Sequence, residues 1–204
     1  MNENLDNKWI SNLALLFYQI FSVEYKDEGF YKKLMAGGGG NSALCATWTK
    51  LSDVFLKYRI SKNAYELLLT FIKDEDKDLI SKNKNDITIS KKIIYDKYHK
   101  FFFNNAKGAE KRKKNGKYFH FDHNPSNKKV LLLLEKKVKE IKDKPDFLNE
   151  LADYIENIQT VDLITVEEDD IRTSEDLKLK GNKMEGKERD KILNTKFYNL
   201  YIVK

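Results

Sequence analysis

The chain has 204 residues, of which 41% are hydrophobic and 34% are charged. This length allows one domain, or one domain with a small appendage, and this composition is typical of a charge-rich globular protein, not of a disordered or collagen-like one. The longest apolar run near the middle of the chain, residues 130–134, is far shorter than the roughly 20 residues that a membrane-spanning helix needs. We therefore expect a protein that does not span a membrane.

The first residues and the single cysteine bear on the expected location. Residues 1–6 carry two acids and no base, the reverse of the basic start of a secretory signal. Cys45 is the only cysteine, which excludes an internal disulfide framework and any zinc site built on paired cysteines. Both observations favour a cytoplasmic location.

Charge is unevenly distributed along the chain. The sequence has 38 lysines and arginines against 32 acids, a formal net charge of +6. Residues 144–176 hold eleven acids and two bases, a local charge of −9, which leaves +15 for the rest. A basic body suits a protein that docks on phosphates, and a concentration of carboxylates suits a metal site. A solvated acidic helix face explains the same segment equally well.

Apolar residues recur at helical spacing through the first half of the chain. Trp9, Leu13 and Leu16 lie three or four residues apart, and later segments repeat the pattern. A polar stretch rich in lysine and asparagine, residues 73–85, connects two of these segments. We expect this half to be all-helical, with helices over residues 7–33 (in two parts), 41–55, 65–72 and 90–103.

The second half begins with a basic loop and then changes its period. Residues 104–117 hold six bases and one acid, with glycines as breakers. Residues 118–122 are strand-forming and end at a turn over residues 123–127. Further along we expect a helix or a strand over 129–141, helices from Pro145 and over 167–176, and strands over 161–166 and 197–203. The predicted class is α+β, with a mainly helical part (1–105) and a second part that contains the predicted strands (106–204).

Asp122 and His123 form the strongest pair of chemistry-bearing residues. They stand at the exit of the strand predicted after the basic loop. Because neighbouring strand residues point to opposite faces, one can bind a metal while the other reaches a water from another direction. Together with the next two residues, Asn124 and Pro125, this pair also makes an ordinary turn sequence. His120 shares a strand face with Asp122, so it is a further possible ligand or phosphate contact.

A second segment adds carboxylates to this pair. Residues 160–173 read as a short apolar strand that leads into an acidic helical turn. Together with the strand that ends in Asp122-His123, this segment resembles the HNH, or ββα-metal, nucleases. In that family a strand ending in Asp-His is followed by a second strand and by a helix that supplies a metal ligand. The family's zinc-knuckle cysteines are replaced here by Val166 and Asp169, so the resemblance implies a unit without structural zinc.

The resemblance implies a role for each matching residue. His123 would be the general base that deprotonates the attacking water. Asp122 and Asp170 would hold one divalent cation, Mg²⁺ or alternatively Mn²⁺, because oxygen ligands suit a hard ion. Asp162 would orient the base, and Arg172 or a lysine of the 107–117 loop would stabilise charge on the phosphorane. The cations expected on DNA phosphates are Lys107, Lys111, Arg112, Lys113, Lys114 and Lys117.

A rival site uses the same aspartate. Asp122 followed by an apolar run that ends in Glu135 and Lys137 resembles the PD-(D/E)XK nucleases, in which the Glu-x-Lys pair lies on one strand face. Residues 128–142 also fit an amphipathic helix, with Glu135 and Lys139 as an i,i+4 pair on its surface. We prefer the helix, and hence the HNH interpretation.

Both resemblances imply metal-dependent hydrolysis of phosphodiester bonds. We therefore expect a DNA endonuclease of the type II restriction enzyme kind that acts on double-stranded DNA, alone or as a homodimer. Residues 1–105 would be its helical DNA-recognition part and residues 106–204 its HNH-like catalytic part. The alternative from another class is a non-catalytic nucleic-acid-binding protein, in which Asp122 and His123 form a turn and the acidic segment contacts a partner.

Overall fold

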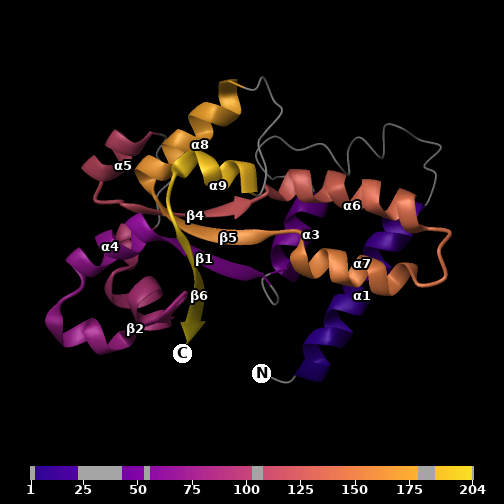
Figure 1. Ribbon diagram of the computed structural model, residues 1–204, viewed down its shortest axis with the longest axis horizontal. Helices are drawn as coiled ribbons and strands as arrows, with labels where there is room; N and C mark the ends of the chain where they lie inside the picture. Colours follow the sequence, from indigo (N-terminus) through magenta and orange to yellow (C-terminus); the bar gives the residue numbers. More distant parts are fainter. Residues whose placement is uncertain (1–2, 23–42, 53–55, 103–107, 179–186, 204) are drawn as a thin grey trace. The chain divides into compact units, whose positions relative to one another are not determined.

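The computed structural model describes residues 3–22, 43–52, 56–102, 108–178 and 187–203 (Figure 1). It is an α+β protein with a mixed six-stranded sheet. No helix in these ranges combines the length and the apolar composition that crossing a bilayer requires.

The chain divides into two compact units, each built from two separate stretches. The expected boundary between residues 105 and 106 falls inside the second unit, because the strands after it belong to the same sheet as strands before it. The helices between residues 125 and 160 belong instead with the N-terminal helices, with which they share a core. The first unit is Met1–Leu56 with Pro125–Thr160, and the second is Lys57–Asn124 with Val161–Lys204.

The first unit is helical in its described part. Its core includes Phe17, whose ring lies 5.6 Å from that of Trp48, and the apolar stripe of the helix over residues 127–141. The indole of Trp48 donates a hydrogen bond of 2.7 Å to the side chain of Gln159, so this buried polar group is satisfied. The helices are α1 (Glu3–Ser22), α3 (Ala43–Ser52), α6 (Asn127–Ile141) and α7 (Phe147–Asn157).

The second unit contains the whole sheet, with strand order β2-β3-β6-β1-β5-β4. Strand β6 pairs antiparallel with β1 and parallel with β3, which itself pairs antiparallel with β2. The strands are β1 (Lys57–Ser61), β2 (Ile80–Asn83), β3 (Asp86–Ser90), β4 (Phe119–Asn124), β5 (Thr160–Thr165) and β6 (Phe197–Val203).

Helical segments complete the second unit. Figure 1 shows α8 and α9 on one side of the sheet and α4 on the other. The segments are α4 (Lys62–Phe71), η2 (Asp74–Leu79), η3 (Lys92–Lys97), η4 (His99–Phe101), α5 (Ala109–Lys114), α8 (Val166–Lys178) and α9 (Lys187–Leu193).

The expectation that the first half is all-helical is wrong, because β1, β2 and β3 lie within it. These strands have only four or five residues, too few for their period of two to stand out among charged neighbours. The alternation is nevertheless present, since Ile87 and Ile89 of β3 are buried and Thr88 between them is only partly so. The strands β4, β5 and β6 and the helices α6, α7 and α8 lie where the sequence predicts them.

Side-chain alternation gives the sheet one apolar and one polar face. The apolar face carries a core that packs on α4 and includes Ile60, Leu68, Phe119, Leu163 and Leu200. The residues next to these in the strands, such as Arg59 and Asp162, point to the opposite side, toward α8 and α9. The functional candidates lie on this polar face.

A capping box fixes the start of α8. The backbone N–H of Glu168 donates to the hydroxyl of Thr165 at 3.2 Å, and the N–H of Thr165 donates to the Glu168 carboxylate at 2.9 Å. The same carboxylate accepts from the hydroxyl of Ser61 at 2.6 Å. The Glu168 carboxylate therefore has a structural role: it joins the first turn of α8 to the end of β1.

Thr165→Ala is expected to lower the free energy of unfolding by about 1 kcal/mol, because it removes the hydroxyl that caps α8. Urea denaturation followed by circular dichroism measures this change. Thr173→Ala, at an exposed position on the same helix, is the control and is expected to stay within about 0.5 kcal/mol. Equal effects of the two substitutions would contradict the capping role.

Candidate metal and phosphate site

Strand β4 presents its polar side chains toward α8. Asn124 on this face donates to Asp162 of β5 at 3.5 Å, and Asp122 lies two residues before it on the same face. His120 is two residues earlier still, while Phe119 belongs to the apolar core and Phe121 packs against it. Alternation thus places His120 and Asp122 side by side on the edge strand of the sheet.

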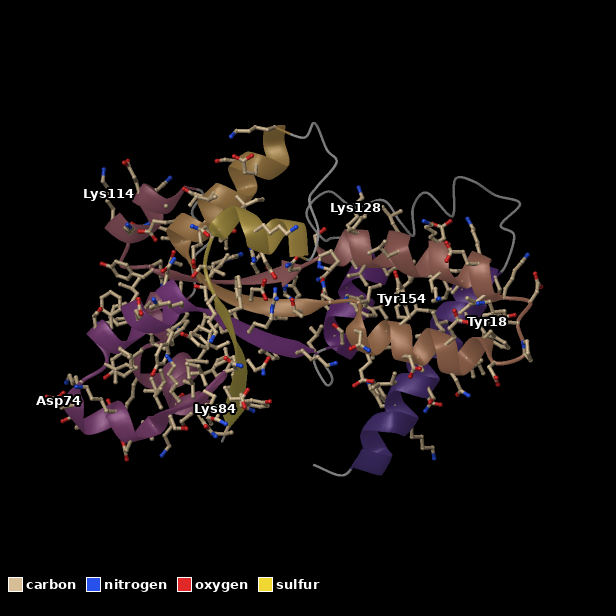
Figure 2. All side chains as sticks on the ribbon, viewed as in Figure 1. Tyr18, Asp74, Lys84, Lys114, Lys128 and Tyr154 are labelled. Atoms are coloured by element: carbon tan, nitrogen blue, oxygen red, sulfur yellow. The ribbon has the colours of Figure 1, made fainter. Side chains whose placement is uncertain are left out.

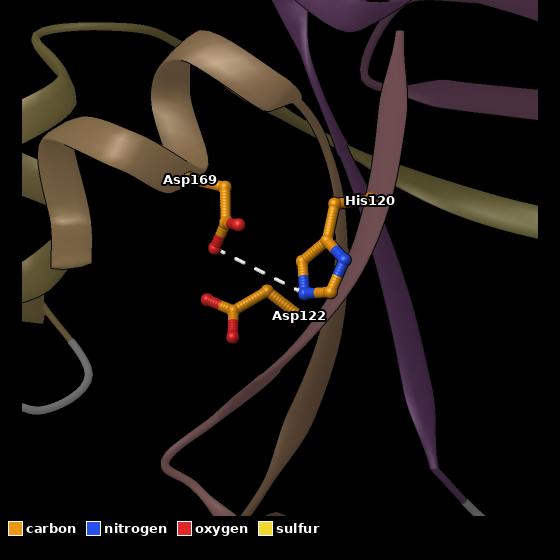
Figure 3. Close-up of side chains that lie close together, drawn as sticks. All are labelled: His120, Asp122 and Asp169. Atoms are coloured by element: carbon orange, nitrogen blue, oxygen red, sulfur yellow. Dashed lines mark ion pairs between the residues drawn. The ribbon is translucent and has the colours of Figure 1, made fainter. Parts of the chain in front are cut away.

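His120, Asp122 and Asp169 form a group of ligand-type atoms that lie within 4.8 Å of one another. Figure 3 shows the three side chains pointing toward one space, the first two from β4 and the third from the first turn of α8. The imidazole Nε2 of His120 is 3.9 Å from the nearer carboxylate oxygen of Asp169. His120 is 41% exposed and the two carboxylates are 14% and 10% exposed, so the imidazole side is open to solvent.

These separations suit a divalent cation after a small contraction. Metal–ligand distances of about 2.1 Å in octahedral geometry place neighbouring ligands about 3.0 Å apart and opposite ligands about 4.2 Å apart. Two carboxylate oxygens and one imidazole nitrogen fit Mg²⁺ or Mn²⁺, and the nitrogen shifts the preference toward a transition metal.

Arg172 lies behind this group and is fully buried. Its Nη1 donates to Asp122 at 2.9 Å, and its Nη2 donates to Asp162 and to Asp190 of α9, both at 3.0 Å. Its guanidinium carbon also lies 5.4 Å from the ring centre of Phe197. The guanidinium therefore joins carboxylates from β4, β5 and α9.

Arg59 of β1 reinforces the same cluster. It makes a bidentate pair with Asp162, with both distances 2.8 Å, and its Nη1 lies 2.8 Å from Asp190. Burial acts to lower the pKa of the Arg59 guanidinium, but hydrogen bonds to the two carboxylates outweigh it and raise that pKa above its usual range. Arg59 thus stays charged and paired.

The ion pairs on this face leave an excess of negative charge. Of the described side chains, five carboxylates pair with three guanidiniums, a balance of −2 when His120 is neutral. One divalent cation would neutralise that charge. The carboxylates are Asp122, Asp162, Asp169, Asp170 and Asp190, and the guanidiniums are Arg59, Arg112 and Arg172.

Asp170, which was expected to bind the metal together with Asp122, contacts the start of α5 and is not part of the His120 group. Its carboxylate accepts the backbone N–H of Ala109 at 2.5 Å, at the start of α5. It is Asp169, one position earlier, that joins the His120 group. Arg112 of α5 links the two aspartates, at 2.6 Å from Asp169 and 3.5 Å from Asp170.

The predicted DNA-binding cations lie in different surroundings. Lys111 and Lys114 are exposed on α5 (Figure 2 labels Lys114) and line a surface hollow beside Asp170. Lys113 pairs with Glu167 of α8. Arg112 is mostly buried in its pairs, Lys117 is half-buried, and Lys107 lies outside the described residues. Of the five predicted cations that the structure describes, Lys111 and Lys114 therefore offer exposed charge next to the acidic group.

Three other expected roles do not match the positions of their residues. His123 follows Asp122 on β4, so alternation places it on the face of Phe119, opposite the metal-like group. Arg172, expected to contact the phosphorane, has no exposed surface and holds three carboxylates. Asp162, expected to orient the base, is likewise fully buried, and it accepts hydrogen bonds from Arg59 and Arg172.

The rival Glu-x-Lys site has a helix where it requires a strand. Glu135 and Lys137 lie on α6 in the first unit, whereas Asp122 lies on β4 in the second. Residues two apart on a helix point about 200° away from each other. Glu135 pairs with Lys139 at 2.5 Å and Lys137 pairs with Glu150 at 2.6 Å, so both serve the surface of the helical unit.

Two members of the cluster have no counterpart among the sequence-based expectations. Arg59 lies on β1 and Asp190 lies in α9, and neither element is among the predicted helices and strands. The only signal for Arg59 is its place between Tyr58 and Ile60, a charged residue alternating with apolar ones.

No family model, curated protein or solved structure matches this chain.

Proposed function

We propose that this protein is a metal-dependent DNA endonuclease whose divalent cation is held by His120, Asp122 and Asp169. The observation that carries the proposal is the convergence of these three side chains beside the basic helix α5. The excess negative charge around them requires a cation before a phosphate can approach.

The order of the elements supports an HNH-like interpretation. Strands β4 and β5 are neighbours in the sheet, and α8 follows β5 directly, which is a strand-strand-helix order. Residues 125–160, which belong to the first unit, form a helical insertion between the two strands. The ligand on the helix would be Asp169 in place of Asp170, since Asp169 lies beside Asp122 and His120.

The proposed division of labour follows from the positions of the side chains. A bound divalent cation would polarise the scissile phosphate and lower the pKa of a water molecule. Asp122 and Asp169 would supply its oxygen ligands and His120 its nitrogen ligand. Lys111 and Lys114 would bind flanking phosphates, which fixes the position of DNA without reading its sequence.

Plasmid cleavage tests the proposal. We expect the wild-type protein to nick or linearise plasmid DNA with Mn²⁺, and more slowly with Mg²⁺, and to be inactive in excess EDTA. His120→Asn is expected to lower the cleavage rate about 100-fold or more, because loss of a ligand exceeds the 10- to 100-fold effect of residues that only orient one.

The matched control is His99→Asn, which replaces an exposed histidine of the same unit and is expected to cleave at the wild-type rate. DNA binding that persists in EDTA, with no cleavage under either metal, would favour the non-catalytic nucleic-acid-binding alternative. Equal cleavage by His120→Asn and wild type would overturn the assigned site.

A further inference from the structure

Arg172 combines complete burial with contacts to three separate elements. It is 0% exposed, and its two terminal nitrogens donate to Asp122, Asp162 and Asp190 at 2.9 to 3.0 Å. The guanidinium carbon lies 5.4 Å from the centre of the Phe197 ring, which adds a cation–π contact. A guanidinium held in this way is a rigid fork with no surface from which to reach DNA.

Asp122 needs such support because of its place in the sheet. It lies on β4, which is an edge strand and therefore pairs with a neighbouring strand, β5, on one side only. The Nη1 atom of Arg172 donates to the Oδ2 atom of Asp122, and the Nη2 atom of the same guanidinium donates to Asp162 of β5. The carboxylate of the edge strand is thereby fixed relative to the interior of the sheet.

We infer that Arg172 is a positioning residue for the metal site: it sets the orientation of Asp122, and with it the affinity for the cation. This inference rests on the proposed function for the identity of the site. It replaces the expectation that Arg172 contacts the scissile phosphate. Residues that orient metal ligands typically change metal affinity 10- to 100-fold when they are replaced.

Arg59 provides a matched control within the same cluster. Like Arg172 it binds Asp162 and Asp190, at 2.8 Å each, but its side chain is 23% exposed. Neither of these carboxylates belongs to the group formed by His120, Asp122 and Asp169. Replacing Arg59 therefore disturbs the shared network but leaves the hydrogen bond from Arg172 to the proposed ligand Asp122 in place.

The test measures Mn²⁺ binding to the full chain in the absence of DNA, from the decrease of the free-Mn²⁺ electron paramagnetic resonance signal. We expect Arg172→Lys to raise the Kd for Mn²⁺ about 10- to 100-fold, because lysine cannot hold three carboxylates with a planar fork. Arg59→Lys is expected to change the Kd less than about threefold, even if both variants melt at lower temperature.

The outcomes separate this inference from the proposed function. Equal Kd values for Arg172→Lys and wild type overturn the positioning role and leave the nuclease proposal standing. Mn²⁺ binding that depends on Arg172, in a protein that cleaves no DNA, supports the positioning role and overturns the nuclease. A wild-type chain that binds no Mn²⁺ overturns both. If Arg172→Lys does not fold, Asp190→Asn removes one acceptor of the same guanidinium, and an unchanged Kd in that variant contradicts the inference.

Discussion

Replacing Asp169 by asparagine is expected to lower metal-dependent DNA cleavage about 1,000-fold, since a metal supplies several kcal/mol of transition-state stabilisation and each 1.4 kcal/mol is tenfold in rate. Asp169 lies in the group with His120 and Asp122, and its carboxylate is only 10% exposed. Asparagine keeps the shape of the side chain and removes the negative charge that would hold the cation.

Asp170→Asn is the matched control, because it changes the adjacent residue in the same chemical way. Both aspartates pair with Arg112, so each substitution weakens one of its ion pairs. Asp170, however, accepts the N–H of Ala109 and lies outside the metal-like group. We expect Asp170→Asn to stay within about threefold of the wild-type rate. Loss of cleavage on replacing Asp170 but not Asp169 would restore the ligand that the HNH resemblance implies.

The sequence predicts those helices and strands that bury one face and are long enough for the period of their apolar residues to be recognised. The stripe of α6 from Val130 to Ile141 is fully buried, and it distinguishes a helix from the strand that the rival nuclease site needs. The short strands β1 and β3 escape prediction for the opposite reason. Each shows only two or three alternations, and the pairing partner of both, β6, lies more than 100 residues away in sequence.

The composition of the site is predictable only in part. Asp122 and Asp162 come from segments with recognisable motifs, and the structure brings both to Arg172. Arg59 joins them because β1 lies next to β5 in the sheet, a tertiary arrangement that no local pattern encodes. The choice between Asp169 and Asp170 depends on rotation about the axis of α8, where neighbouring residues point about 100° apart.

The acidic segment of residues 144–176 divides between the two units. Its first part, around α7, has exposed or half-exposed acids; hydrogen bonds from Lys137 and Lys144 lower the pKa of the Glu150 carboxyl in this part. Its second part holds Asp162, Glu168 and Asp169, all of which are buried. The solvated-face explanation therefore fits the first part of the segment, and only the second part contributes to the candidate site.

Replacing Asp162 by alanine is expected to destabilise the fold by about 3–5 kcal/mol, the usual effect of removing one partner from a buried ion pair. Asp162 is fully buried and accepts hydrogen bonds from both Arg59 and Arg172, at 2.8 to 3.0 Å. Without it, two guanidiniums remain in a desolvated site with fewer carboxylates to balance them. Because a domain is stable by only about 5–15 kcal/mol, this loss is a large fraction of the total.

Urea denaturation of Asp162→Asn and Asp162→Ala measures the effect, and the asparagine variant is expected to lose less because it retains one acceptor oxygen. Glu140→Ala is the control, since Glu140 forms an exposed i,i+4 pair with Lys136 at 3.8 Å and should change stability by less than about 0.5 kcal/mol.

The double variant Arg59→Met with Asp162→Ala is expected to lose less free energy of unfolding than the sum of the two single variants, because it removes a guanidinium that has lost its partner. Strict additivity, or a loss below about 1 kcal/mol for Asp162→Ala, would contradict the view that this carboxylate holds the polar face together.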